Sequence, residues 1–177
     1  MPLVKSGHIA EDRFVRVLDE EPVPESGAVI VPATRFLADH AEFARREAPT
    51  GVIWPNARSV AELVPHLDRL ALVALVFPTF KDGRAYSQAR LLRERYAFRG
   101  ELRATGDVLR DQFLYLLRSG FDSFEAKKTS DAEAFAQVVA RYSVFYQPTG
   151  DGRLSARRRR LSDIERGRQQ GAHEVAQ

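Results

Sequence analysis

Charged and polar side chains gather in two short stretches near the middle of the chain. The first runs from Lys81 to Ser87 and the second from Arg103 to Gln112. Basic side chains that stand where strands end and helices begin can bind an anion, such as phosphate, sulfate, sulfite or a carboxylate. We therefore predict a ligand-binding site made of Lys81, Asp82, Arg84, Tyr86, Ser87, Arg103, Asp107, Arg110, Asp111, Gln112 and Lys127.

A repeating pattern of strand, turn and helix would position these residues. Short apolar runs start at Ala28, Val52, Leu72, Glu101 and Phe121, with starts 20 to 29 residues apart, which is the spacing of βα units. Strands joined through a helix are parallel to each other. The sequence thus predicts an α/β fold with a mostly parallel sheet of about five βα units, either open or shaped like part of a barrel. The carboxyl ends of such strands meet along one rim. That rim would also carry Thr34, Arg35, Asn56, Arg58 and Lys128.

Other segments carry helix and edge-strand signals. The stretches from Ser59 to Glu62 and from Ser130 to Glu133 match the capping box that opens a helix. Alternation between Phe14 and Leu18 predicts an N-terminal edge strand or a small hairpin. One helical face is predicted from Phe36, Leu37, His40, Phe43 and Ala44.

Some of the candidate site residues also fit structural roles. Asp82 and Asp107 stand where helices should begin, so they could instead be helix caps. Alternation places Arg103 on one face of a strand, and both faces of a strand within a parallel sheet are usually apolar. Arg103 therefore needs a partner. That partner could be a ligand or a carboxylate, such as Asp82, Asp107 or Glu125.

The composition excludes several kinds of chemistry. The chain has no cysteine, which excludes thiol nucleophiles, disulfides and cysteine-held clusters. Its four histidines are far apart in the sequence and give no support for a metal site. The motifs GxGxxG, GxxxxGK[ST] and GxSxG do not occur, so standard dinucleotide, nucleotide and hydrolase sites are unsupported. Neither catalytic residues nor a cofactor can be assigned from these patterns.

The charge distribution divides the chain into a body and a tail. The net charge is +3, and without the tail's seven basic and four acidic residues the body carries 20 of each sign. We expect a single α/β domain over residues 1–149 and a basic tail over residues 150–177 that is disordered or transiently helical. The tail's four consecutive arginines could serve solubility or an acidic partner, and the lack of interleaved aromatic residues gives little support to nucleic-acid binding.

We expect a cytoplasmic protein that does not enter the membrane. The longest apolar run, from Leu70 to Pro78, is far shorter than a membrane span, and the N-terminus lacks the apolar region of a secretory signal.

The middle of the chain contains FPTFKDGRAYSQARLLRERYAFRGELRATGDVLRDQ, followed by SGFDSFEAK. These blocks resemble a bacterial family named domain of unknown function 934, and the similarity extends over roughly Gly27 to Pro148. Members of that family tend to be encoded beside assimilatory sulfite reductase. The family carries no established catalytic residues that could be transferred to this chain.

The resemblance implies a role in sulfite reduction and sulfur assimilation. One hypothesis is an accessory protein that binds a small anion, sulfite reductase or another sulfur-assimilation enzyme. A second is an oxidoreductase that uses a flavin or NADPH held by the same cationic rim. A third, nucleic-acid binding, rests on the tail's arginines alone.

Overall fold

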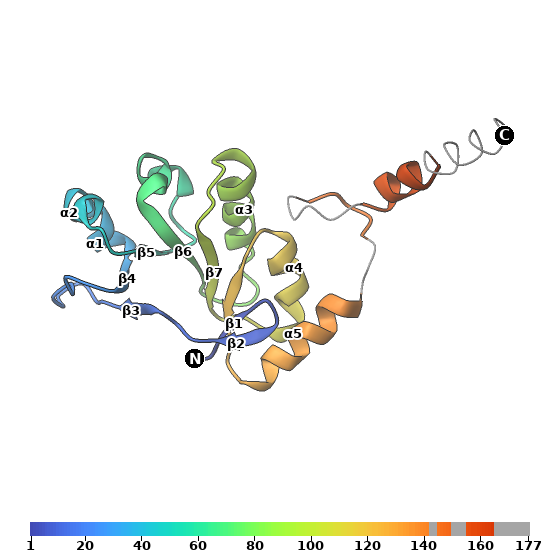
Figure 1. Cartoon of the computed structure of the whole chain (residues 1–177), viewed down its shortest axis with the longest axis horizontal. Helices are drawn as coiled ribbons and strands as arrows, with labels where there is room; N and C mark the ends of the chain where they lie inside the picture. Colours follow the sequence, from blue (N-terminus) through green and yellow to red (C-terminus); the bar gives the residue numbers. More distant parts are fainter. Residues whose placement is uncertain (142–144, 150–154, 165–177) are drawn as a thin grey trace, which may run out of the picture.

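The computed structural model describes residues 1–141, 145–149 and 155–164. An eight-stranded sheet curls into an open half-barrel, with helices on its outer side (Figure 1). The strand order is β2-β1-β8-β7-β6-β5-β4-β3. The strands are β1 (Leu3–Lys5), β2 (His8–Ala10), β3 (Phe14–Arg16), β4 (Ala28–Pro32), β5 (Thr50–Trp54), β6 (Leu70–Phe77), β7 (Glu101–Gly106) and β8 (Ser123–Glu125).

The sheet is mixed. Strands β3 to β8 pair in parallel, whereas β1 pairs in the antiparallel sense with both β2 and β8. The α/β class, the five predicted strands β4 to β8 and the edge strand β3 are confirmed, but the prediction of a mostly parallel sheet is wrong. The sequence pattern missed β1 and β2 because neither lies within a longer apolar or alternating run, whereas the alternation around β3 continues to Leu18.

The helical segments are mostly short. They are α1 (Ala33–Ala38), α2 (His40–Arg45), the 3-10 helix η1 (Val60–Arg69), α3 (Arg84–Arg90), the π-helical turn η2 (Leu91–Arg95) that continues α3, the 3-10 turn η3 (Arg110–Gln112), α4 (Phe113–Arg118) and α5 (Ser130–Arg141). The helical face predicted around Phe36 is split at Asp39 into α1 and α2. Ser59 caps η1 as predicted, because its hydroxyl accepts the N–H of Ala61 at 3.2 Å. Glu62 does not complete the capping box and pairs with Arg58 instead.

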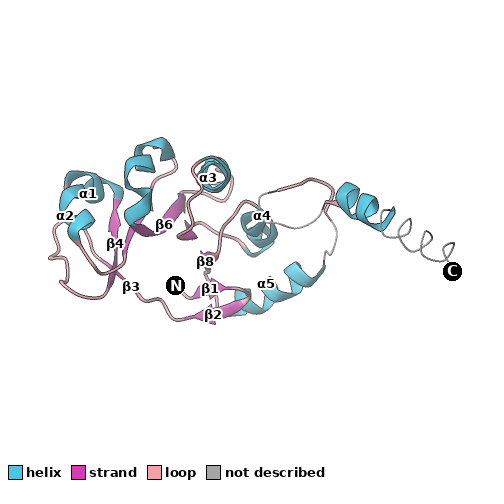
Figure 2. Cartoon of the chain, turned by 45° about the horizontal axis from the view of Figure 1, so that its top comes forward, coloured by secondary structure: helices cyan, strands magenta, loops and turns pink. Residues whose placement is uncertain are grey.

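The main core lies between the outer face of the sheet and the helices (Figure 2). Alternate residues of the central strands, such as Val73, Leu75 and Leu102, point into this core and are fully buried. The inner face carries a second, smaller apolar cluster built on Ile30, Leu72 and Ala74. The two faces of the sheet therefore have different chemistry, and only the outer face is covered by helices.

The two edges of the sheet are tied together by a very short connection. Strands β2 and β3 lie at opposite ends of the strand order, yet only residues 11–13 separate them in the chain. A connection of this length spans at most roughly 14 Å, whereas eight strands in a flat sheet would extend over about 34 Å. The sheet must therefore curl. We call residues 11–13 the strap.

Part of the predicted tail is ordered and anchored to the body. Residues 156–164 are helical, and Phe145 forms an isolated parallel bridge with Ser155. Arg118 of α4 donates to the carbonyl oxygen of Gln147 at 2.5 Å, and its guanidinium lies 4.0 Å from the ring centroid of Phe145. The prediction of disorder for residues 150–154 and 165–177 falls outside the described residues. Among the helices of the described ranges, none has the length and apolar character needed to cross a bilayer.

His66 on η1 makes the stability of this fold depend on pH. Its ring packs edge-on against Phe36 with 5.5 Å between centroids and lies 5.2 Å from the ring of His40. Burial, aided by the charge of His40, lowers the pKa of His66 from its usual 6.5. The folded protein then binds fewer protons than the unfolded chain, so the free energy of unfolding should fall as the pH drops below about 6.5.

Urea unfolding at about pH 7.5 and about pH 5.5 tests this expectation. The His66→Asn variant should lose less stability between the two pH values than the wild type does. His8→Asn, at an exposed histidine, is the control and should behave as the wild type. An equal loss in wild type and His66→Asn would contradict the assignment.

Candidate functional site

The loops that follow β6, β7 and β8 are joined at the rim by two side chains. Asp107, directly after β7, accepts the N–H of Phe80 at 2.9 Å and the ammonium of Lys127 at 2.5 Å. Gln112 accepts the N–H of Leu109 and donates to the carbonyl oxygen of Phe80, both at 3.0 Å. Three loops that are far apart in sequence therefore lie together, as expected for the carboxyl ends of parallel strands.

Gly106 allows this junction to form. Its φ of +94° lies in the left-handed region, and a Cβ atom at this position would stand 2.4 Å from the carbonyl oxygen of Phe77. That same carbonyl accepts the N–H of Asp107 at 2.8 Å. The chain thus turns at Gly106 in close contact with β6, and this turn aims Asp107 at its two partners.

Asp82 and Arg84 form an exposed ion pair at the start of α3. The Asp82 carboxylate accepts from the Arg84 guanidinium at 2.6 Å and from the Arg84 backbone N–H at 3.3 Å. These bonds hold the pKa of Asp82 well below its usual range. The nearby side chain of Asn56 also lowers the pKa of Asp82. The Asn56 amide nitrogen has no hydrogen-bond partner among the described residues, so its effect on Asp82 is electrostatic.

The sequence left open whether Asp82 and Asp107 are helix caps, and the structure answers differently for the two. Asp82 is not the N-cap of α3, which is Gly83, but from the position before it Asp82 accepts the first backbone N–H of the helix. Asp107 is not a cap, since its carboxylate joins neighbouring loops instead.

Three other predicted residues lie on α3 or just before it. Tyr86 is half-buried and packs edge-on against Phe77, with 5.2 Å between ring centroids, and burial raises the pKa of its hydroxyl to about 12. The Lys81 ammonium lies 5.7 Å from the ring centroid of Phe80.

Ser87 lies on the outer surface of α3, in a shallow hollow that it shares with Arg90, Leu91, Glu94 and Arg95. Apart from Ser87, none of these hollow-lining residues was predicted to belong to the site.

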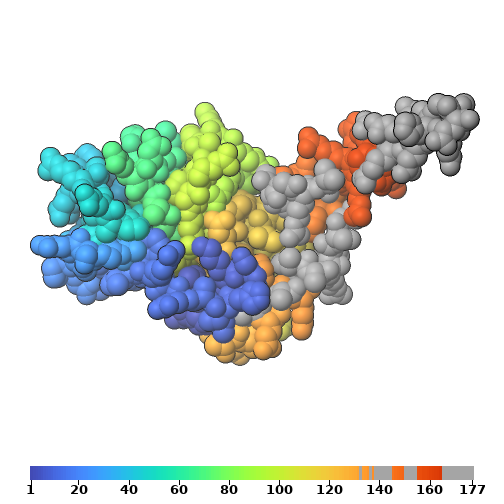
Figure 3. Space-filling view, in the orientation of Figure 1, coloured from blue at the N-terminus to red at the C-terminus, as the bar shows by residue number. Residues whose placement is uncertain are grey.

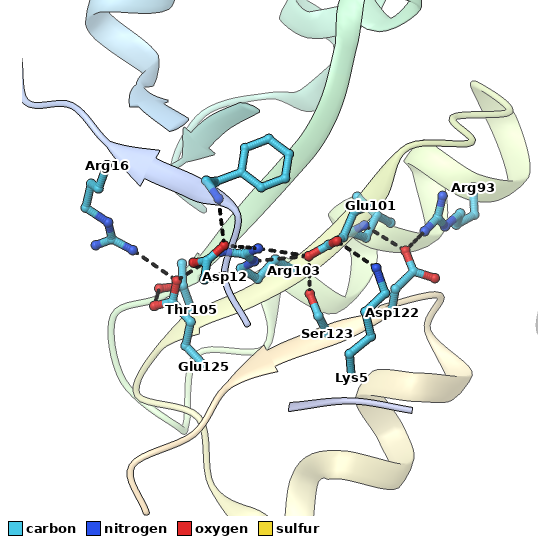
Figure 4. Close-up of polar contacts among 12 residues, drawn as sticks. Lys5, Asp12, Arg16, Arg93, Glu101, Arg103, Thr105, Asp122, Ser123 and Glu125 are labelled. Atoms are coloured by element: carbon cyan, nitrogen blue, oxygen red, sulfur yellow. Dashed lines mark hydrogen bonds and ion pairs between the residues drawn. The ribbon is translucent and has the colours of Figure 1, made fainter. Parts of the chain in front are cut away.

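Arg103 does not lie at the rim, and this corrects the prediction. It sits in the middle of β7 on the inner face of the sheet, with a side chain that is only 2% exposed. Its guanidinium donates to the two carboxylate oxygens of Asp12 at 2.7 and 3.0 Å and to Glu101 at 3.1 Å (Figure 4). Glu125, a predicted partner, lies 3.9 Å away. The main partner, Asp12, was missed because it belongs to the strap, 91 residues earlier in the chain.

Arg103 is the centre of a larger set of polar contacts, which we call the inner-face network. Glu101 also accepts from Ser123 at 2.6 Å and from Lys5 at 2.9 Å. Burial acts to raise the pKa of Glu101, but these hydrogen bonds and the neighbouring cations outweigh burial, and the pKa is lowered. The network contains Lys5, Asp12, Arg16, Glu101, Arg103, Thr105, Ser123 and Glu125.

The inner-face network ties the sheet edges and the strap to the centre of the sheet. Arg16 of β3 pairs with Glu125 of β8 at 3.0 Å, and Thr105 donates to the same carboxylate at 2.5 Å. The network holds three cations and three carboxylates, so its charges balance. Because each charged group has an opposite partner within the protein, the structure gives Arg103 a structural role.

A cavity of about 410 Å³ opens at the rim, between the loops after β7 and β8 and the amino end of α5. We call it the rim pocket. It is lined by Val108, Leu109, Arg110, Asp111, Lys127, Lys128, Ser130 and Asp131. Lys127 is paired with Asp107, whereas Arg110 and Lys128 form no side-chain ion pair within the described ranges. The amino end of a helix carries a partial positive charge, which adds to these cations. The rim pocket thus places two basic side chains, which have no ion-pair partner among the described residues, beside the amino end of α5.

A family model matches residues 51–156, which is more than half of the chain, and its description reads bacterial protein of unknown function (DUF934). The chain belongs to the DUF934 family. No curated protein matches it. The matched region contains β5 to β8 and the loops that form the rim pocket, so the site lies within the part shared with the family. The strap precedes the matched region, and the match ends where the C-terminal helix begins.

The rim of the sheet has a second group of polar side chains, at the end of β5. Trp54 Nε1, Asn56 Nδ2 and Gln88 Oε1 are buried and have no hydrogen-bond partner among the described residues. Gln88 Nε2 donates to the carbonyl oxygen of Arg58 at 2.8 Å, and the Arg58 guanidinium lies 5.3 Å from the centroid of the Trp54 ring. Sequence patterns placed Asn56 and Arg58 on the rim. They missed Trp54 and Gln88, because a strand-end tryptophan and a mid-helix glutamine look like ordinary packing residues.

Asp107 should control the order of the rim loops. Replacing it with alanine removes the acceptor of the Phe80 N–H and the partner of Lys127, so we expect the Phe80 amide to exchange its hydrogen several-fold faster. Hydrogen exchange followed by NMR measures this rate residue by residue. Asp68→Ala, which removes an exposed carboxylate from η1, is the control and should leave the Phe80 rate unchanged. An unchanged rate in Asp107→Ala would show that the loops are joined by other contacts.

Proposed function

We propose that this protein is an accessory factor of assimilatory sulfite reduction that binds a small oxyanion, such as sulfite, in the rim pocket. One observation carries the binding part of this proposal. Arg110 and Lys128 line a cavity beside the amino end of α5 and have no ion-pair partner in the described part of the chain. The link to sulfite reduction comes from the sequence resemblance, because relatives tend to be encoded beside the reductase.

The charges at the rim favour binding of an anion over binding of a cation. The lining residues include two carboxylates and three basic side chains, one of which, Lys127, is paired with Asp107. One of these carboxylates, Asp131, already accepts the backbone N–H of Lys128 at 3.0 Å. An oxyanion can accept hydrogen bonds from guanidinium and ammonium groups at the same time, and charge-assisted hydrogen bonds of this kind are strong. Arg110 and Lys128 are therefore the groups that we expect to contact the ligand.

The cavity also has room for more than a small ion. A sulfite ion would fill only part of about 410 Å³, which leaves space for a carboxylate side chain presented by the reductase. Ligand and reductase would then meet at the same rim. The function that we propose is to bring the oxyanion and the reductase together.

Isothermal titration calorimetry with sulfite and with sulfate tests the proposal. The double variant Arg110→Ala/Lys128→Ala should bind the ion at least about tenfold more weakly than the wild type, because it loses two charge-assisted contacts. The matched control, Arg45→Ala/Arg69→Ala, removes two exposed arginines elsewhere on the surface and should change the affinity less than about twofold. Affinity should also fall as salt is added, since salt screens charge.

Two further measurements separate this proposal from its alternative. The reductase, purified from the same host, should bind the wild type more tightly than the Arg110→Ala/Lys128→Ala variant. A rise in melting temperature with FMN, FAD or NADPH would favour an oxidoreductase with its own cofactor. If neither sulfite, sulfate nor the reductase binds, the proposed function is wrong.

A further inference from the structure

The C-terminal helix, residues 156–164, carries a group of basic side chains that have no ion-pair partner among the described residues. Arg157, Arg158, Arg159 and Arg160 are consecutive, and none of the four guanidinium groups forms an ion pair or a hydrogen bond with the described residues. Other arginines of the chain, such as Arg93 and Arg103, are paired with carboxylates. The helix therefore presents positive charge that nothing in the described chain neutralises.

A groove with a partly apolar lining lies beside these arginines. It has a volume of about 440 Å³ and is lined by Tyr146, Pro148, Ser155, Arg157, Arg158 and Leu161. Tyr146 is 89% exposed and Leu161 is 50% exposed. Ile164 follows Leu161 by three residues and is 53% exposed, so the two share a helical face. Large apolar side chains left in water beside a groove mark an interaction surface.

The groove is held at a fixed place on the body. Arg118 of α4 donates to the Gln147 carbonyl oxygen and to the Thr149 hydroxyl, and the bridge between Phe145 and Ser155 joins the two sides of the groove. Beyond this anchor the helix projects away from the sheet (Figures 1 and 3). A partner could therefore reach the helix without displacing any part of the body.

The chemistry of this surface fits a protein partner. Tyrosine and arginine are the residues that most often dominate binding energy at protein interfaces. Leu161 and Ile164 would gain nothing from contact with a phosphate backbone. The helix spans only nine residues and exposes two aliphatic side chains, which is little apolar surface for binding to a membrane. A second copy of the chain would bring four more arginines and repel the first.

We propose that the C-terminal helix and its groove form a docking arm for an acidic segment of a partner protein. Carboxylates of the partner pair with Arg157 to Arg160, and an apolar side chain flanked by those carboxylates enters the groove beside Tyr146 and Leu161. The docking arm lies at and beyond the end of the family match, so it adds to this chain a surface separate from the rim pocket. The proposal does not depend on the rim pocket binding an anion.

Selection from a phage-displayed library of random short peptides tests the docking arm. The full-length chain should enrich peptides in which acidic residues surround a leucine, isoleucine or aromatic residue. The best peptide should bind at least about tenfold more weakly to Arg157→Gln/Arg158→Gln and to Leu161→Ser, since each variant removes one half of the recognition. The control Arg45→Gln/Arg69→Gln should bind as the wild type does. All three sets of substitutions are at exposed or groove positions outside the core, so the fold should be retained.

Three results would overturn the docking arm. The first is a selection that enriches no peptide or peptides without acidic residues. The second is equal loss of binding in the control. The third is tighter binding of a single-stranded DNA oligonucleotide, or of vesicles that contain phosphatidylglycerol, with the same dependence on Arg157 and Arg158. Sulfite calorimetry on the same variants should be unchanged, which keeps this test separate from that of the rim pocket.

Discussion

Replacing Arg103 with alanine should lower the free energy of unfolding by about 3–5 kcal/mol, the range found when one partner of a buried ion pair is removed. Glu101 and Glu125 would stay on the inner face of the sheet without the cation between them. Asp12 would lose both of the hydrogen bonds that fix the strap. Urea unfolding at neutral pH measures the change.

The control for the Arg103→Ala variant breaks an ion pair that is exposed to solvent. Arg90→Ala breaks the pair with Glu94, whose side chains are 54% and 42% exposed, and should cost less than about 1 kcal/mol. Sulfite affinity offers a second readout. If Arg103 is structural, the folded fraction of Arg103→Ala should bind sulfite as the wild type does. Equal destabilisation by the two variants would contradict the closure of the half-barrel by the inner-face network.

Gly106→Ala should lower the free energy of unfolding by about 2–3 kcal/mol. A left-handed backbone costs a residue with a Cβ atom about 1–2 kcal/mol, and the contact at 2.4 Å with the Phe77 carbonyl oxygen adds to that cost. Because Gly106 aims Asp107, the variant should also bind sulfite more weakly. Chemical denaturation and calorimetry measure the two effects.

Gly27 is a matched control for Gly106. It has a similar φ of +85°, but a Cβ atom there would have nothing within 4 Å. Gly27→Ala should therefore show the backbone cost alone, with no change in sulfite affinity. The difference between the two variants isolates the close approach of β7 to β6. Equal costs would mean that this approach relaxes freely.

The parallel part of the sheet could be predicted because its signals are local. Each of β4 to β8 has a short apolar run of its own, and the spacing of the runs implies helical crossovers. The hairpin of β1 and β2 left no such trace, since β1 gains its place by pairing with the distant β8, and β2 by pairing with β1. The βα units predicted a sheet that is open or shaped like part of a barrel, which agrees with the open half-barrel, but they gave no sign of the hairpin and the strap that accompany the curl.

The location of the site was easier to predict than the roles of its residues. Parallel topology alone brings the loops after β7 and β8 together, and the rim pocket lies there. Whether a polar residue joins loops, as Asp107 and Gln112 do, depends on which loops are neighbours. The role of Arg103 depends on a carboxylate 91 residues away, which no local pattern reveals. Ligand binding by the rim residues stays a prediction.

The inner face of the sheet and the rim at its carboxyl ends differ in how their charges are paired. On the inner face, charged groups are paired with each other and hold the half-barrel together. At the carboxyl ends of the strands, Arg110 and Lys128 are left without such partners within the described chain. These two cations beside a cavity are the observation that supports our proposal of an anion ligand.

The most direct test of this account is amide chemical-shift mapping by NMR while sulfite is added to the full-length protein. The account predicts saturable shifts confined to the loops that line the rim pocket, residues 108–112 and 127–131, and their loss in Arg110→Ala/Lys128→Ala. Shifts that never saturate, or that fall on Arg157 to Arg160 instead of the rim, would contradict it.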